Sequence, residues 1–277
     1  MPGRIAVVSD VHGNTTAFEA VLADIEARGI RRIINLGDVV GKGPRGSEAI
    51  ALTRAHCEVT VRGNWDTFIA RDETQLWPAA QWTHDELSPD DRAWLLALPN
   101  THDLVMSGQH VRFFHASQVH EFHRVNYDHT PEEFRGMFTN TDFTGDGPTP
   151  TVVGYGDIHG TYLEVDLGLT LFNAGSVGNP LDAPGAPYVI LEGDPDTGPD
   201  SFPGTFPGSF PGSGPESGPA VAAPGGRAGP SITFVRVPYD VEAEIAVARE
   251  LGMPDVEAYA LELREQVYRG SAFPPPS

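Results

Sequence analysis

The 277-residue sequence has little cysteine and no long apolar segment. Its single cysteine, Cys57, excludes an intramolecular disulfide and a zinc site built from several thiolates. Cys57 opens the apolar run Cys57-Glu58-Val59-Thr60-Val61, so we expect it to be a core residue in a buried strand. No stretch approaches the ~20 consecutive apolar residues that span a bilayer, and no basic-then-apolar leader precedes the first predicted strand. We therefore expect a cytoplasmic protein without a membrane partner.

Positive charge is also scarce. The chain has 18 Lys and Arg against 38 Asp and Glu, which gives a formal net charge of -20. Because binding to nucleic acid or to an anionic membrane needs a broad basic face, long nucleic acid is not an expected partner. We attribute most of the acidity to solubility or salt adaptation. An anionic substrate would then have to meet locally bound positive charge, which metal ions could supply.

Strand-like and helix-like patterns alternate along the first 65 residues, which predicts an α/β fold. Ile5-Ala6-Val7-Val8 is typical of a buried strand, and residues 14–29 carry apolar side chains at helical spacing before a glycine. Residues 67–100 are mostly helical in pattern and are expected to form a helical flank. The remaining predicted strands are 32–36, 58–61, 101–106, 109–114, 151–155, 162–166, 169–173, 187–192 and 232–237. The remaining predicted helices are 47–54, a short helix capped by Thr130-Pro131-Glu132-Glu133, 241–251 and 254–269.

Residues 193–230 consist largely of Gly, Pro and Ser and repeat the triplet Phe-Pro-Gly three times. Such a composition cannot bury enough apolar surface to form a packed core. We interpret this segment as a mobile insertion between two strands of one domain that spans residues 1–277. A binding role for the Phe-Pro-Gly units is the alternative.

Polar side chains follow several of the predicted strands at the point where each strand ends. If the backbone stays extended beyond residue 8, Asp10 and His12 point to the same side and could bind one cation. A capped turn before the next helix is the alternative for this pair. Oxygen and nitrogen donors without sulfur suit Mn, Fe, Zn, Mg or Co better than a structural zinc. Two ions that share a carboxylate would use the whole set, which is Asp10, His12, Asp38, Asn64, His115, Asp157 and His159.

These residues occur in blocks that resemble, in order and spacing, the five signature blocks of calcineurin-like metallophosphoesterases. The blocks are Asp10-Val11-His12-Gly13-Asn14, Gly37-Asp38, Gly63-Asn64, His115 and Gly156-Asp157-Ile158-His159. The resemblance covers residues 4–192 and resumes at 231–269, where Val237-Pro238-Tyr239-Asp240 is similar to the tail of the small bacterial branch. It implies an α/β fold in which a two-sheet β-sandwich is flanked by helices. It also implies two divalent metal ions, Mn first, with Fe, Zn, Mg, Co or Ni as alternatives.

The resemblance also implies a role for each residue. One metal would be held by Asp10, His12 and His159, and the other by Asn64 and His115, with Asp38 as the bridge. The cationic and polar groups nearest to the blocks are Asn14, Lys42, Arg45 and Arg62, and among them we expect Asn14 and Arg62 to act on the substrate together with Asp38 and Asn64.

Two positions depart from the family pattern. Asp157 stands where the family has a histidine, so it is either a harder, charged ligand of the second metal or no ligand. Trp65 stands where many relatives have a histidine that protonates the leaving group, and an indole cannot do this near neutral pH. His120 and His123 are the alternative proton donors that lie near in sequence. Trp65 could instead stack on an aromatic group of the substrate, or simply pack.

The resemblance implies hydrolysis of a phosphate ester by a hydroxide that bridges the two metals. We expect a phosphodiester or a small phosphorylated metabolite or nucleotide as substrate, because Trp65 removes the proton donor that a poor leaving group needs. One alternative is a protein serine/threonine phosphatase, although the loop from Gly41 to Gly46 lacks the Asp-Arg pair of that family. The other is a metal-binding module with impaired catalysis, which Asp157 and Trp65 would favour. The sequence does not indicate an oligomeric state.

Overall fold

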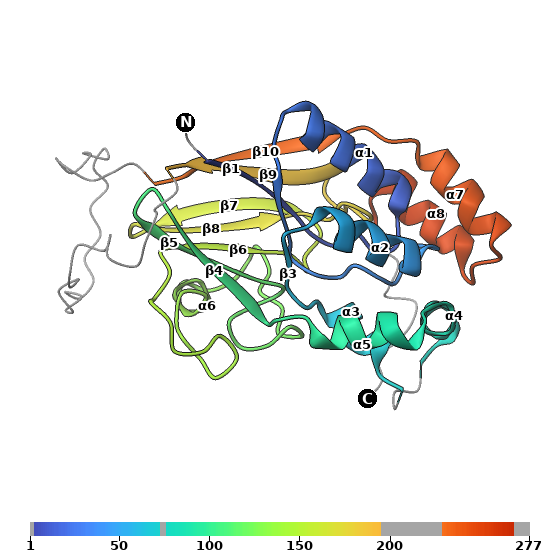
Figure 1. Ribbon diagram of the computed structural model, residues 1–277, viewed down its shortest axis with the longest axis horizontal. Coiled ribbons are helices and arrows are strands. Elements are labelled where there is room, and N and C mark those ends of the chain that lie inside the picture. The colour runs from blue at the N-terminus through green and yellow to red at the C-terminus, as the bar shows by residue number, and fades with distance from the viewer. Residues whose placement is uncertain (1–2, 73–75, 195–228, 269–277) are drawn as a thin grey trace.

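The computed structural model describes residues 3–72, 76–194 and 229–268, and within them two five-stranded mixed sheets pack face to face with helices outside (Figure 1). The first sheet has the order β10 (Ser231–Val237), β9 (Ala186–Gly193), β1 (Gly3–Val8), β2 (Arg32–Asn35) and β3 (Val59–Thr60). The second has the order β4 (Thr101–Met106), β5 (Gln109–Phe114), β6 (Val152–Tyr155), β8 (Leu169–Ala174) and β7 (Thr161–Asp166). The expected α/β fold with a two-sheet sandwich is confirmed.

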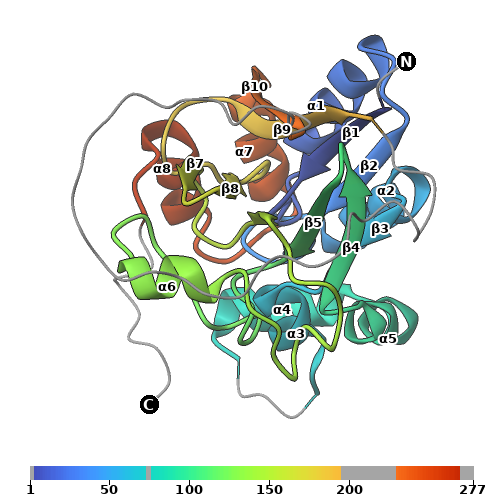
Figure 2. The same cartoon turned by 90° about the vertical axis from the view of Figure 1, so that its left-hand side faces the viewer.

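The helices cover the outer faces of this sandwich and one of its ends. They are α1 (Thr15–Ala27), α2 (Gly46–His56), α3 (Asn64–Ala70), α4 (Pro78–Glu86), α5 (Pro89–Ala97), α6 (Pro131–Gly136), α7 (Val241–Glu250) and α8 (Val256–Glu265). Helix α7 packs beside α1 and α8, and helices α3 to α5 lie on the opposite side of the molecule from α1 (Figures 1 and 2). No helix among the described residues is both long enough and apolar enough to cross a membrane.

Alternation of side chains along β1 builds two layers of the core. Ile5 and Val7 face the second sheet, where they join a cluster with Phe113 and Phe172. The intervening residues of β1 face α1 and pack in a separate cluster that includes Phe18. This is the period-two pattern of a strand that is buried on both faces. The outer face of the second sheet forms a third cluster against α6.

The direction of the strands brings their carboxyl ends together. Strand β1 pairs in parallel with β2, and β2 with β3, through the connecting helices α1 and α2. In the second sheet β6 pairs in parallel with β5 and β8. The loops that follow β1, β2, β5 and β6 therefore open at one end of the sandwich, which is where a site between parallel strands is expected.

Two local expectations, the third strand and the place of Cys57, need correction, and a third concerns residues that the structure mostly does not describe. The third strand is limited to Val59–Thr60, and Cys57 is not in it, because Cys57 caps the end of α2 and packs, partly buried, against the core. The predicted insertion at 193–230 lies mostly outside the described residues, as do the Phe-Pro-Gly repeats. The strands on either side of it, β9 and β10, pair antiparallel with Ser231 opposite Glu192.

Candidate metal centre

The backbone of the first signature block is turned, not extended. Strand β1 ends at Val8, and Asp10 and His12 have φ angles of 54° and 50°. The same left-handed conformation recurs at Asp38 (55°), Asp157 (66°) and His159 (60°), each after the end of a strand. Residues other than glycine adopt it at a cost in free energy, and such residues cluster at functional sites. The expectation of an extended segment was therefore wrong, although both side chains reach the same place.

Two glycines in the blocks are required by close approach. A Cβ atom on Gly63 would lie 2.1 Å from Asp38 Oδ1, and a Cβ atom on Gly156 would lie 2.1 Å from Ser9 Oγ and 2.6 Å from Asp10 Oδ2. Real Cβ atoms do not come so near, so any other residue here would push these carboxylates out of place. The glycines allow backbone from different strands to surround the carboxylates.

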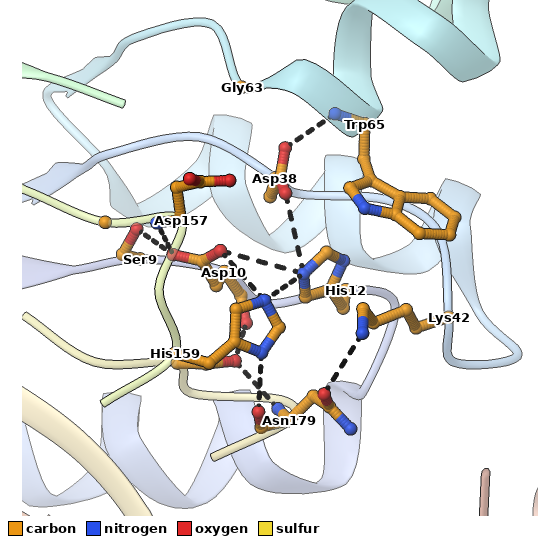
Figure 3. Close-up of polar contacts among 12 residues, drawn as sticks. Ser9, Asp10, His12, Asp38, Lys42, Gly63, Trp65, Asp157, His159 and Asn179 are labelled. Atoms are coloured by element: carbon orange, nitrogen blue, oxygen red, sulfur yellow. Dashed lines mark hydrogen bonds and ion pairs between the residues drawn. The ribbon is translucent and has the colours of Figure 1, made fainter. Parts of the chain in front are cut away.

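Asp10, His12 and His159 form a buried cluster from two different sheets (Figure 3). The two Nε2 atoms of the histidines lie 3.1 Å apart, and Asp10 Oδ1 lies 3.3 Å from His159 Nε2 and 3.7 Å from His12 Nε2. Three donor atoms that converge in this way are positioned to bind one divalent cation.

The hydrogen bonds of the histidines orient this cluster. His12 Nδ1 donates to the Val40 carbonyl at 3.2 Å, and His159 Nδ1 donates to the Asn179 carbonyl at 2.7 Å. Because a carbonyl only accepts, Nδ1 carries a proton in each ring, and Nε2 is the nitrogen that each ring turns toward the other. Two facing Nε2 atoms at 3.1 Å repel unless a proton or a metal ion lies between them. The pair therefore fits a metal.

Asp38 lies beside this cluster (Figure 3) and also contacts a second one. Its Oδ2 atom is 3.5 Å from His12 Nε2, and its Oδ1 atom is 3.4 Å from His115 Nε2. His115 Nδ1 donates to the Leu36 carbonyl at 2.8 Å, so Nε2 is the ring nitrogen that could bind a cation, in exchange for a proton. Asp10, Asp38 and His115 again place donor atoms within 4.8 Å of one another.

Three buried atoms at these clusters have no hydrogen-bond partner among the described residues, namely Asp10 Oδ1, Asn64 Oδ1 and His115 Nε2. A buried polar atom without a partner costs free energy, so such atoms require an explanation. All three are oxygen or nitrogen atoms of the kind that Mn and related divalent ions bind, His115 Nε2 once its proton is released. The residues present thus fit divalent metal ions.

Electrostatics differ between the two clusters. Burial opposes ionisation of Asp10, but His12 and His159 outweigh it and hold the pKa of this carboxyl well below its usual range. Burial lowers the pKa of His12 in spite of Asp10 and Asp38, so this ring is neutral near pH 7. His115 is also buried, yet the carboxylates led by Asp38 raise its pKa well above the usual value.

Asp157 is held by a cation that the sequence did not reveal. Arg124 donates from Nε to Asp157 Oδ2 at 2.7 Å and from Nη2 to Oδ1 at 2.8 Å. Asn64 Nδ2 donates to the same Oδ1 at 2.9 Å, and His115 Nε2 is 3.9 Å away. Arg124 lies 33 residues earlier, in the loop between β5 and α6. The one available signal was the unusual carboxylate at Asp157, which called for a cationic partner.

Asp66 is a second residue that the sequence reasoning missed. Its buried carboxylate accepts from the backbone N–H of Asp38 (2.8 Å), Val39 (2.8 Å) and Gly63 (3.0 Å). Burial and the charge of Asp38 raise the pKa of Asp66 to about 7, whereas the N–H groups of Gly63 and Val39 favour the ionised form. Asp66 ties the loop after β2 to the start of α3.

Lys42 is the cation that lies beside the first cluster (Figure 3). Its Nζ donates to Asn179 Oδ1 at 3.3 Å and lies 5.0 Å from the ring centre of Tyr268 and 5.9 Å from that of Trp65. Burial lowers the pKa of Lys42, and Glu262 is the nearest of the carboxylates that oppose this effect. Lys42 also has a left-handed backbone, with φ at 58°.

Trp65 packs in an aromatic cluster next to the metal ligands. Its ring meets those of His12 and Trp77 edge-on, each at 5.6 Å, and that of Phe68 at 6.0 Å. Its backbone N–H donates to Asp38 Oδ1 at 2.8 Å. A Cβ atom on Gly41 would lie 2.2 Å from the indole, so the loop after β2 fits closely over this ring.

Other expected substrate groups have different partners. Asn14 caps α1 by accepting from Ala17 N, and its Nδ2 donates to the Gly178 carbonyl. Arg62 donates to the Leu96 carbonyl and to Asn100, so these donors face the end of α5. The structure thus engages Asn14 and Arg62 elsewhere than at the carboxylates.

The remaining sequence candidates also lie apart from the ligands. Arg45 donates to Thr16 Oγ1 at 2.7 Å and pairs with buried Glu244. His120 is half exposed and lies 3.1 Å from Glu121. Neither His120 nor His123 contacts a metal-ligand candidate among the described hydrogen bonds and ion pairs.

Buried carboxylates and imidazoles at the strand ends of a two-sheet α/β sandwich form a candidate site for divalent metal ions. The chain belongs to the calcineurin-like phosphoesterase superfamily, whose domain matches residues 4–196.

Known proteins share this sequence and fold. The chain is 32% identical over 194 residues to an uncharacterised protein of Methanocaldococcus jannaschii. The aligned segment covers 64% of this chain and 77% of that relative. The solved structure of a metallophosphoesterase from Sphaerobacter thermophilus is similar, with a TM-score of 0.68, 25% identity and coverage of 96% of this chain and 100% of that one. A hypothetical protein from Pyrococcus horikoshii shares the fold, with a TM-score of 0.67 at 15% identity over 95% and 98% of the two chains.

Proposed function

We propose that this protein is a metal-dependent phosphoesterase that hydrolyses a phosphodiester or a small phosphorylated metabolite or nucleotide. The observation that carries the proposal is the facing pair of Nε2 atoms of His12 and His159, 3.1 Å apart and next to the unpartnered Asp10 Oδ1. This arrangement is costly without a cation and favourable with one. Membership of the calcineurin-like phosphoesterase superfamily supports the reaction class.

The described side chains could hold two divalent ions, with Mn expected first. One would lie at Asp10, His12 and His159, and the other at His115 and Asn64, with Asp38 between them. When bound, such ions lower the pKa of water and neutralise charge on phosphoryl oxygens.

The surrounding residues set how the substrate is received. Lys42 places positive charge next to the ligands, and Trp65 forms an apolar wall beside His12. The indole has no proton to donate near neutral pH, and neither nearby histidine of the loop after β5 contacts the ligands. Leaving groups that depart without protonation, as from activated or diester phosphates, therefore suit this site best. The net charge of -20 favours a small substrate over long nucleic acid.

The test compares two chromogenic substrates, bis(p-nitrophenyl) phosphate and p-nitrophenyl phosphate, with the purified protein and Mn. We expect turnover of both with preference for the diester, and loss of turnover in Asp38→Asn, because the carboxylate between the clusters is removed. Asp90→Asn, an exposed aspartate at the start of α5, is the matched control and should behave as wild type.

A metal-binding module with impaired catalysis is the second candidate function. Two observations favour it: Trp65 replaces a proton donor, and Asp157 is engaged by Arg124. Mn bound to the protein with no turnover on either substrate, or on a phosphopeptide, would replace the phosphoesterase proposal with this one.

A further inference from the structure

The two metal positions differ in what competes for their ligands. At the first, Asp10 Oδ1 has no hydrogen-bond partner, and the Nε2 atoms of His12 and His159 lie 3.7 Å and 3.3 Å from it. At the second, both oxygens of Asp157 accept hydrogen bonds from Arg124. Asp157 is absent from the two groups of donor atoms that converge within 4.8 Å.

A bidentate pair between arginine and carboxylate is strong and geometrically specific. Asp157 is 2% exposed at its side chain, so it cannot turn to solvent, whereas Arg124 is 50% exposed and enters from the surface. To coordinate a cation, Asp157 would have to give up hydrogen bonds from Arg124. A guanidinium so near the position would also repel a second positive ion.

Asn64 is drawn into the same arrangement. Its Nδ2 donates to Asp157 Oδ1 at 2.9 Å, which leaves Asn64 Oδ1 as the atom that is buried and without a partner. The Arg124–Asp157 pair thus orients Asn64 with its oxygen free to bind a cation. Asp157 acts through its neighbours at this position, and Asp38, Asn64 and His115 are left as the direct ligands.

We propose that the Arg124–Asp157 ion pair makes the two metal positions unequal, so that the second ion binds more weakly than the first. Arg124 is then a positioning residue that withholds Asp157 from the second ion. This inference rests on the proposed function, because it assumes that the residues at the strand ends bind divalent metal. It specifies a protein that fills its metal positions in two steps.

The test is calorimetric titration of Mn²⁺ into the full-length protein after removal of metal with a chelator. Wild type should show one tight and one weak site. Removal of the guanidinium in Arg124→Gln should tighten the weak site by about ten- to a hundred-fold, the equilibrium equivalent of a lost charged hydrogen bond, and leave the tight site unchanged. Arg264→Gln removes a surface pair with Glu242 and is the matched control, expected to titrate as wild type.

A second variant and a spectroscopic measurement keep the inference testable if Arg124→Gln does not fold. Asp157→His supplies the imidazole that the family has at this position and should also tighten the weak site. In both variants the spin-coupled EPR signal of a Mn pair should develop at lower Mn²⁺ concentration than in wild type.

Two equal sites in wild type, or a weak site that neither variant tightens, would overturn the inference and leave the phosphoesterase proposal intact. If wild type binds no Mn²⁺, the proposed metal centre fails instead. The two failures are thus distinguishable.

Discussion

Asp66 offers a direct test of how the metal ligands are positioned. Its Oδ2 accepts from the N–H groups of Asp38 and Gly63, and its Oδ1 accepts from those of Val39 and, at 3.4 Å, Val40. In Asp66→Asn one of these oxygens becomes an amide nitrogen, which cannot accept. Either orientation of the amide leaves two buried N–H groups unpaired and facing another donor. At about 1–3 kcal/mol for each such group, the free energy of unfolding should fall by about 2–6 kcal/mol.

The measurement is urea unfolding followed by far-UV circular dichroism, with a chelator present so that metal binding does not contribute. Asp90→Asn, exposed at the start of α5, controls for the lost charge. Because Asp66 anchors the backbone of Asp38, the affinity for Mn²⁺ should also fall, by about 10–100-fold. A loss of stability below about 1 kcal/mol, relative to that control, would refute the assignment of Asp66 as the anchor of this loop.

Three further predictions concern other parts of the chain. Trp65→His introduces a proton donor and should raise the ratio of alkyl to aryl phosphomonoester turnover by up to about 10²-fold. An unchanged ratio would show that protonation of the leaving group is not what the site lacks. Burial raises the pKa of the Cys57 thiol to about 12, so the thiol should react slowly with Ellman's reagent at pH 8 until urea unfolds the protein, and fast reaction of the native protein would contradict this. The free energy of unfolding should also fall as pH rises above about 9, because the thiol then loses its proton in the unfolded state but keeps it in the folded state. Replacement of residues 195–228 by a short turn should leave the melting temperature and turnover nearly unchanged, because β9 and β10 pair directly beside it, and a large loss of either would show that the segment has a structural or functional part.

The ligand residues were predictable because they occur in short local blocks. Each block places a carboxylate, imidazole or amide directly after an apolar strand, often beside a glycine, and strand ends in an α/β fold converge. That reasoning identified Asp10, His12 and His159, which the structure brings together, and Asp38, which lies between them and His115. It did not anticipate the left-handed backbone at Asp10 and His12, because backbone angles at a turn depend on hydrogen bonds to another strand, here from Asp10 N to the Gly37 carbonyl.

Residues that act by orienting the ligands could not be predicted in the same way. Arg124 and Asp66 stand in segments with no signature of their own, one in a polar loop and the other in the first turn of a helix. Their partners are backbone amides and a carboxylate up to 33 residues away. Asn14 and Arg62 are also near the blocks in sequence. In the structure, however, Asn14 caps α1 and Arg62 binds the end of α5. Sequence proximity does not determine which way a long or polar side chain points.

The sequence by itself determined the class of this protein, because several apolar strands each end in oxygen and nitrogen donors. Its composition also excludes a site built from several cysteine thiolates and a broad basic face. Those features are local and survive without knowledge of contacts. Only the tertiary structure decided that Asp157 faces a guanidinium, since that pairing joins two loops from different strands. Because a buried carboxylate takes its character from its nearest partner, the proposed inequality of the two metal positions depends on this contact.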